Sequence, residues 1–153
     1  MSETTPAWLL RVANDIQFSI SEHQAMEYIE NPLLHYIPKT PASCKNIIYW
    51  RDKIVPVIDM NILFDHSGTI NTQHLMVIAY QEKEHTPLQY VAYILASAPE
   101  KIIVNDDTAV ELPEFFPEKL KPFVLSSFSY NHQPTSIFDI AQLNPASLEY
   151  NRE

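Results

Sequence analysis

Apolar and polar residues alternate along much of the chain with the period of two that is typical of β-strands. From Ile16 to Ser21, for example, Ile, Phe and Ile alternate with Gln and Ser, as in a strand with one buried face. The pattern predicts strands over residues 8–13, 16–21, 47–50, 53–59, 74–80, 88–95, 123–130 and 135–140. Many short strands separated by turn signals favour a mainly β barrel or sandwich over a fold in which strands and helices alternate.

The segments between the predicted strands carry few helical signals. Short helices are predicted around residues 60–64, 117–121 and 141–148. The segment 65–73 carries Gly68, the one glycine of the chain, and is predicted to link its two halves. Pro56 lies inside a predicted strand. Because proline cannot donate a ladder hydrogen bond, this position predicts a sheet edge or a bulge.

The stretch from Tyr49 to Met60 is the most informative part of the pattern. Two apolar runs flank a charged trio, Arg51-Asp52-Lys53, which is short enough to be a hairpin turn. Asp is one of the few non-glycine residues that adopt the left-handed conformation that tight hairpins require. A hairpin with an arginine at its tip and no catalytic group beside it indicates a recognition surface.

Composition limits the class of protein. With 153 residues, of which 46% are hydrophobic, the chain can bury a core for one domain or for two small intertwined lobes. The formal net charge of −9 argues against partners such as nucleic acid or an anionic membrane surface. Cys44 is the only cysteine, so no internal disulfide can form. The N-terminus lacks a signal-peptide layout, and no apolar run approaches the roughly 18 residues of a membrane helix. We therefore expect a cytoplasmic protein that does not insert into membranes.

The sequence offers no constellation that supports catalysis. The six histidines lack the spacing of metal ligands, and a chain with one glycine cannot build a glycine-rich phosphate loop. Cys44 has no evident base nearby, so we expect a partly buried thiol rather than a nucleophile. The adjacent carboxylates Asp106 and Asp107 lie in a predicted polar turn. We therefore expect no enzyme activity, no cofactor and no metal site.

Several segments resemble CheW-like domains, the bacterial chemotaxis coupling proteins. The family signature is usually Asn-Leu-Arg-Gly, two or three residues, and Pro-Val-Ile-Asp-Leu. Arg51 and Pro56-Val57-Ile58-Asp59 fit this signature, with Asp52 in place of the glycine. Residues 8–12 resemble the family's opening strand, and residues 26–29 resemble its apolar–Glu–Ile segment.

The resemblance implies a fold and a function. The implied fold is mainly β, with two small SH3-like β-barrel lobes in one domain, 8–148. The lobes would cover about 14–68 and 71–140, with the terminal segments exchanged between them. The implied function is a non-catalytic adaptor that couples the cytoplasmic tip of methyl-accepting chemoreceptors to the regulatory domain of a CheA-type histidine kinase. Asp52, Asn46 and Ala92 replace family glycines, which suggests a divergent copy for an accessory pathway, such as one controlling type IV pili.

The resemblance also implies a partner-binding site. Its residues would be Arg51, Glu27, Met26, Asn46 and Asp52. In the family the matching arginine lies near the groove between the lobes, where the receptor tip docks.

Other interpretations remain open for these residues. Arg51 could instead form a structural ion pair with Asp52 or Asp59, and Met26 could be a core residue. Asp59 is expected to hold the turn that follows it. Two other functions also remain open: a degenerate scaffold or decoy that no longer binds both partners, and a small-ligand binder or enzyme on the same barrel.

Overall fold

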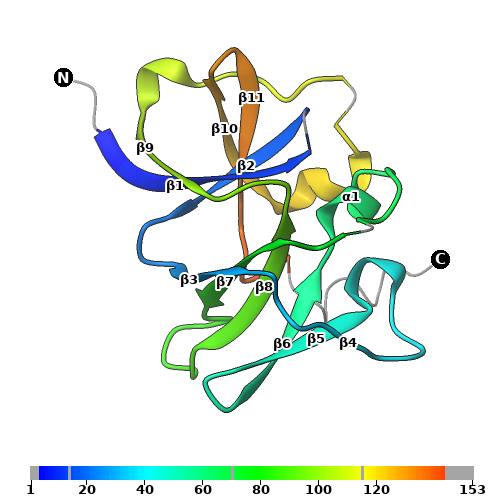
Figure 1. Ribbon diagram of the computed structural model, residues 1–153. Helices are drawn as coiled ribbons and strands as arrows, with labels where there is room; N and C mark the ends of the chain where they lie inside the picture. Colours follow the sequence, from blue (N-terminus) through cyan, green and yellow to red (C-terminus); the bar gives the residue numbers. More distant parts are fainter. Residues whose placement is uncertain (1–3, 14, 70, 115, 144–153) are drawn as a thin grey trace.

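The computed structural model describes residues 4–143 except 14, 70 and 115. It consists mainly of two curled β-sheets, which form the upper and lower halves of the molecule in Figure 1. The upper sheet has the strand order β10-β11-β2-β1-β9. Its strands are β1 (Thr4–Ala13), β2 (Ile16–Ser21), β9 (Glu100–Asn105), β10 (Val124–Tyr130) and β11 (Gln133–Phe138).

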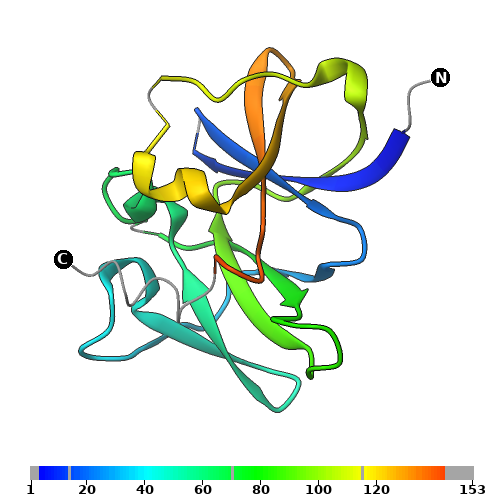
Figure 2. The same cartoon turned by 180° about the vertical axis from the view of Figure 1, so that it is seen from behind.

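The lower sheet has six strands in the order β3-β7-β8-β6-β5-β4. They are β3 (Ala25–Glu30), β4 (His35–Tyr36), β5 (Asn46–Trp50), β6 (Lys53–Ile58), β7 (His74–Tyr80) and β8 (Gln89–Leu95). The short helices are α1 (Met60–Leu63), η1 (Ala42–Cys44), η2 (Asp106–Thr108) and η3 (Glu118–Phe123). Seen from behind, α1 and η3 lie near each other where the two sheets meet (Figure 2). The expected mainly β fold is confirmed.

The two sheets share one core and each has a smaller core of its own. Phe18 of β2 packs against Tyr93 of β8 at 5.4 Å and against Phe138 of β11 at 5.6 Å between ring centroids. Leu9 and Leu10 are adjacent in β1 and both fully buried. Leu9 belongs to the core inside the five-stranded sheet, and Leu10 belongs to the core shared between the sheets. This double burial explains why β1 reads as a continuous apolar run rather than an alternating one.

Three strands were not predicted from the sequence: β3, β4 and β9. Each lies at an edge of its sheet; of the four edge strands, only β10 was predicted. Edge strands are partly solvated on both faces, so their apolar periodicity is weak. In β3, for example, none of the six residues is fully buried.

The predicted helices were correct only in part. The helix around 60–64 is confirmed as α1, whereas the segment around 117–121 forms a 3-10 helix over 118–123, with Pro122 inside it. Residues 141–143 form turns, and the rest of the predicted helix 141–148 lies outside the described residues.

The segment 65–73 does not link the halves of the molecule. It joins α1 to β7, and the strands before and after it, β6 and β7, belong to the same sheet. The chain passes between the sheets after Ser21 and after Leu95 instead. Gly68 is not in a left-handed conformation, and a Cβ there would lie 3.3 Å from Ile62 Cδ1. The absence of a side chain at Gly68 therefore allows this segment to approach α1 closely.

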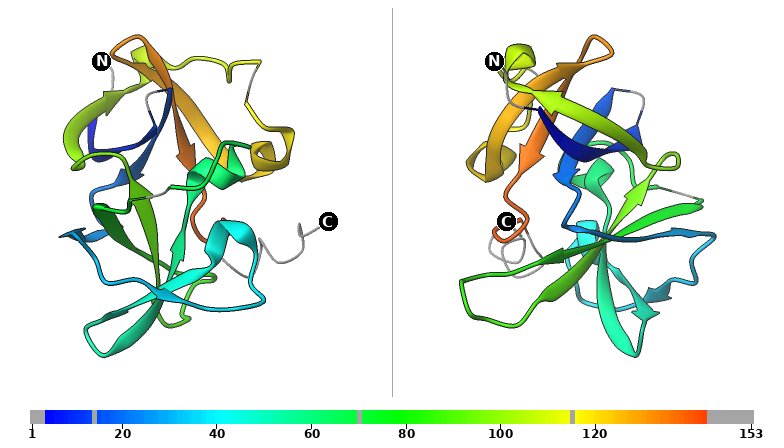
Figure 3. Two further views of the ribbon diagram at one scale, coloured as in Figure 1. Left: turned by 45° about the vertical axis from the view of Figure 1, so that its right-hand side comes forward. Right: turned by 90° about the vertical axis from the view of Figure 1, so that its left-hand side faces the viewer.

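The sheets also divide the chain differently from the expected lobes 14–68 and 71–140. The five-stranded sheet combines residues 4–21 with 100–138, and the six-stranded sheet spans 25–95. The N- and C-terminal parts of the chain thus meet in one sheet, where β11 runs parallel to β2 (Figure 3).

Pro56 lies in an inner strand, β6, rather than at a sheet edge. The register between β6 and β8 comprises Val57 and Ile58. Pro56 therefore precedes the point where β8 begins to pair, so its missing N–H interrupts no recorded bond to β8.

Candidate partner-binding site at the hairpin tip

The predicted hairpin is formed by β5 and β6. Trp50 pairs with Lys53, which leaves Arg51 and Asp52 as a two-residue turn. Their φ angles of 47° and 62° are those of a type I′ turn, whose twist matches that of the flanking strands. The turn is therefore one residue shorter than the predicted trio, since Lys53 belongs to β6. An arginine in the left-handed region is unusual and carries a conformational cost.

Arg51 and Glu27, which were predicted as site residues from separate segments, lie together. Arg51 Nη2 is 3.2 Å from Glu27 Oε1, and Trp50 Nε1 donates to the same oxygen at 3.3 Å. The guanidinium carbon also lies 4.5 Å from the centre of the Trp50 ring, within cation–π distance. Arg51 does form an ion pair, as the structural alternative expected. Its partner is Glu27, however, and not Asp52 or Asp59.

Below this exposed pair lies a buried aromatic support. Trp50 is only 5% exposed and packs against Tyr90 of β8, with 5.1 Å between ring centroids. The side chain of Arg51 is 59% exposed. The Trp50 ring thus supports one face of the Arg51 guanidinium, while the rest of this charged group remains open to solvent.

The other predicted site residues are placed differently. Met26 is partly buried against the core of the six-stranded sheet, which favours its interpretation as a core residue. Asn46 begins β5, four residues before Trp50 and hence roughly 13 Å along the strand. It lines a separate pocket of about 200 Å³. Asp52 is exposed at the turn. Asp59 caps α1 and accepts from Thr69 N at 2.7 Å, so its predicted role in the turn is confirmed.

The hairpin tip does not lie in the groove between the sheets. It projects from the end of the six-stranded sheet that points away from the five-stranded sheet (Figure 1). The expected position of Arg51 near the inter-lobe groove is therefore not observed.

An exposed apolar face on the other side of the hairpin from Trp50 was missed by the sequence analysis. Tyr49 and Ile54 pair directly across β5 and β6, and each is 65% exposed. His35 packs against Tyr49 at 4.9 Å between ring centroids. Tyr49 alternates with the buried Ile48 and Trp50, so the signal was the placement of an apolar residue on the solvent face of the strand.

A similar glutamate joins edge strands in the other sheet. Glu100 of β9 accepts from the Tyr130 hydroxyl of β10 at 2.6 Å and lies 3.3 Å from an Arg11 nitrogen. The hydrogen bond from Tyr130 is the main reason why the pKa of Glu100 is lowered, and Arg11 adds to it. Glu27 likewise connects the edge strand β3 to the end of β5. Both curled sheets are thus bridged by a glutamate across a gap in their strand pairing.

The described residues offer no metal centre or membrane span. No group of three or more His, Cys, Asp or Glu side chains among them could hold a metal ion. None of the described helices has the length and apolar character needed to cross a membrane. Cys44 is buried at 8% exposure, as expected.

Comparison with known proteins places this arrangement in a family. The sequence model of the CheW-like domain matches residues 7–146, which is nearly the whole chain. The chain belongs to the CheW-like domain family. Among solved structures, the CheW-like chain resembles the scaffolding protein TtCheW from Thermoanaerobacter tengcongensis, with a TM-score of 0.73 and 17% identity. This match covers 92% of the chain and 88% of TtCheW, and it shows the shared fold. No curated protein sequence matches the chain.

Proposed function

We propose that this CheW-like chain is a non-catalytic adaptor in chemotaxis-type signalling. It would join the regulatory domain of a CheA-type histidine kinase to the cytoplasmic tip of methyl-accepting chemoreceptors. The family match and the scaffolding protein among its structural neighbours support an adaptor role. The observation that carries the proposal is the exposed β5–β6 hairpin tip. It presents the Arg51 guanidinium on the face of Trp50 and the apolar side chains of Tyr49 and Ile54 on the opposite face.

The hairpin tip has the properties of an interface hot spot. Arginine presents five N–H donors, and the recorded ion pair of Arg51 uses Nη2. Because Glu27 and Trp50 already orient the guanidinium, Arg51 would lose less side-chain freedom on binding than an unrestrained arginine. Hot spots combine such an anchor with neighbouring apolar area.

The exposed hairpin face, defined as Tyr49, Ile54 and His35, supplies that apolar area. Since it lies away from the groove between the sheets, we assign the face and Arg51, with Glu27 and Asp52, to the kinase regulatory domain. A dynamic signalling contact of this kind needs no more than roughly 1,200 Å² of buried surface.

The receptor tip would bind elsewhere on the same chain. The family resemblance implies that it would bind where the two sheets meet. Asn46 lines a pocket with Lys45, which precedes it in the chain, and with Thr69 and Thr72 from the connection between α1 and β7. We assign Asn46 to this receptor side, apart from the hairpin tip. Met26 would then support Glu27 from the core rather than touch a partner.

A titration with matched variants tests the assignment to the kinase. The double variant Tyr49→Ser and Ile54→Ser removes the exposed hairpin face, and Leu88→Ser removes a comparably exposed leucine outside it. We expect the double variant to bind the kinase regulatory domain at least about tenfold more weakly, with Leu88→Ser unchanged. Equal affinity of all three proteins would exclude the hairpin face. A wild-type chain that binds neither kinase nor receptor fragments would favour the decoy alternative.

We also propose that this adaptor serves an accessory pathway, such as one controlling type IV pili. The support is the replacement of family glycines by Asp52, Asn46 and Ala92, of which Ala92 is fully buried between β6 and β7. Comparing the affinity for the kinases of the flagellar and the accessory pathways tests this. Preference for the flagellar kinase would contradict it.

A further inference from the structure

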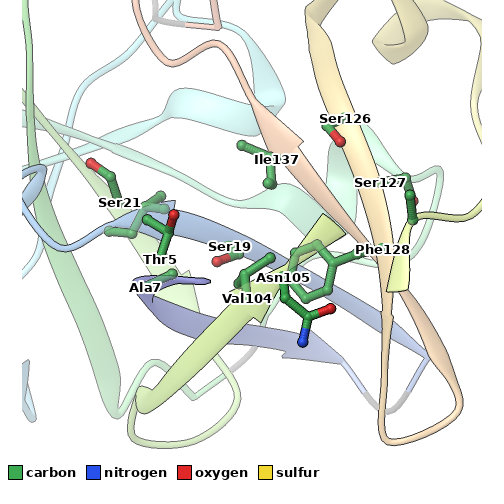
Figure 4. A pocket seen from close by; sticks show the side chains of 12 residues that line it. Thr5, Ala7, Ser19, Ser21, Val104, Asn105, Ser126, Ser127, Phe128 and Ile137 are labelled. Atoms are coloured by element: carbon green, nitrogen blue, oxygen red, sulfur yellow. The ribbon is translucent and has the colours of Figure 1, made fainter. Parts of the chain in front are cut away.

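The five-stranded sheet encloses a cavity of about 250 Å³, to which the proposed adaptor function assigns no role. It lies where the curled sheet is incompletely closed, between the edge strands β9 and β10 (Figure 4). An isolated bridge between Ala109 and Phe128 connects β10 to the segment after β9 at this place. The cavity is thus a defined space inside one curled sheet, far in the fold from the hairpin tip.

Part of the cavity wall is apolar, and the rest is formed by serine, threonine and asparagine residues. Figure 4 shows Phe128, Val104 and Ile137 around one space, and the Phe128 ring is 4% exposed. The mouth is formed by Ala109 and Ser126, which are both exposed. An aromatic wall with a solvent-accessible mouth is the usual form of a small-molecule pocket.

The hydrogen bonds of two polar side chains on the wall, Asn105 and Ser19, determine which donor and acceptor groups remain for a ligand. Asn105 Oδ1 accepts from the Asp107 N–H at 3.0 Å, which orients the amide and leaves its NH₂ as a donor. Ser19 Oγ donates to the Trp8 carbonyl at 3.0 Å, so its lone pairs are left as acceptors. Ser127, next to Phe128 in β10, is also among the residues that line the cavity (Figure 4).

The absence of charged residues from the wall disfavours the binding of an ionised ligand. The lining residues of the cavity are alanine, isoleucine, valine, phenylalanine, serine, threonine and asparagine, none of them charged. An ionised ligand would lose hydration there without gaining a counter-charge. The size is also restrictive, since an apolar cavity of about 150 Å³ already holds benzene.

We propose that this cavity binds a small neutral aromatic molecule of one or two rings that carries one N–H or O–H group. The ring would pack against Phe128, and its polar group would donate to Ser19 Oγ. This site is independent of the proposed adaptor function, because the residues that we assign to kinase binding belong to the other sheet.

Indole is a suitable probe because it is neutral, bicyclic and has one N–H donor. Titration of the full chain, followed by backbone amide chemical shifts, should give saturable changes centred on Ser19, Val104 and Phe128. Ala109→Phe fills the mouth and should weaken binding at least about tenfold. Ala98→Phe adds the same ring at an exposed position outside the cavity and should have no effect. Indole-3-acetate, with its negative charge, should bind more weakly than indole.

Absence of saturable shifts at these residues would overturn the proposal. So would indole binding that Ala109→Phe and Ala98→Phe affect equally. If Ala109→Phe fails to fold, Ser126→Phe on the opposite side of the mouth provides the same test, because Ser126 is also exposed.

Discussion

Glu27 and Arg51 are 24 residues apart in the chain, yet their side chains meet at 3.2 Å and join the edge strand β3 to the β5–β6 hairpin. Trp50 donates to the same carboxylate. The arrangement has two consequences. It bridges the six-stranded sheet where β3 and β5 are not paired, and it orients an exposed guanidinium over Trp50 at the hairpin tip.

Arg51→Ala should weaken binding of the kinase regulatory domain by about 1–2 kcal/mol while the fold persists. The reason is that Arg51 is exposed and preoriented, so its loss removes contacts rather than core packing. Lys101→Ala is a matched control, because Lys101 forms an ion pair with Glu22 of nearly the same exposure on the other sheet. Isothermal titration of both variants measures the effect. Unchanged affinity of folded Arg51→Ala would remove Arg51 from the site.

Glu27→Gln should change the free energy of unfolding by less than about 1 kcal/mol, because exposed ion pairs contribute little. It should nevertheless weaken kinase binding, since the orientation of Arg51 depends on the carboxylate. Denaturant unfolding and titration on the same samples separate the two effects. Wild-type affinity in Glu27→Gln would mean that Glu27 does not position Arg51.

The sequence predicted the two members of this pair but not their contact. Arg51 was identified from the hairpin signature and Glu27 from a resemblance in another segment. Their proximity depends on how β3 folds across the sheet to the end of β5, which is a long-range property that local periodicity does not contain. Asn46 shows the converse, because it lies near Arg51 in sequence but at the other end of the strand.

The inner strands could be predicted because their burial imposes a clear apolar pattern, and β2 and β7 match the predicted bounds. The edge strands β3, β4 and β9 could not, because they are only partly buried. The link between the halves was misplaced for another reason. The segment 65–73 with Gly68 was predicted to join the two halves, whereas the missing side chain of Gly68 makes room for Ile62 and the segment connects elements of one sheet.

The Glu100–Tyr130 hydrogen bond should make stability depend on pH. The pKa of Glu100 is lowered in the folded state, so its contribution is present above the ordinary value of 4.5 and is lost as the pH falls through the folded pKa. The pKa of Tyr130 is raised, chiefly by the same bond, so its contribution is present below 10.0 and lost as the pH rises further. Denaturant unfolding of Glu100→Gln should therefore show a flatter pH dependence at both ends. A profile parallel to that of the wild type would contradict this.

Tyr93→Phe should lower the free energy of unfolding by about 1–2 kcal/mol. The ring would keep its packing against Phe18, but the buried hydroxyl that donates to the Leu143 carbonyl at 2.9 Å would be lost. Tyr80→Phe is a useful control, because the Tyr80 hydroxyl is less deeply placed and donates to Gln89. Chemical denaturation measures both. A loss no greater in Tyr93→Phe than in Tyr80→Phe would show that the Leu143 contact is unimportant.

Asp52→Gly should raise the free energy of unfolding by about 0.5 kcal/mol, because glycine adopts the left-handed conformation of the turn without steric cost. Asp107→Gly, at a 3-10 position outside the set of left-handed residues, should give no gain. Thermal or denaturant unfolding compares the two. Destabilisation by Asp52→Gly would mean that the aspartate side chain holds the turn.

The most direct test of the adaptor role is the mass of a mixture of three proteins. Purified chain, kinase regulatory domain and a receptor-tip fragment are combined and analysed by size-exclusion chromatography with light scattering. Two separate binding surfaces on one chain predict a complex that contains all three components. Formation of only binary complexes that exclude each other, or of no complex at all, would contradict the proposed adaptor.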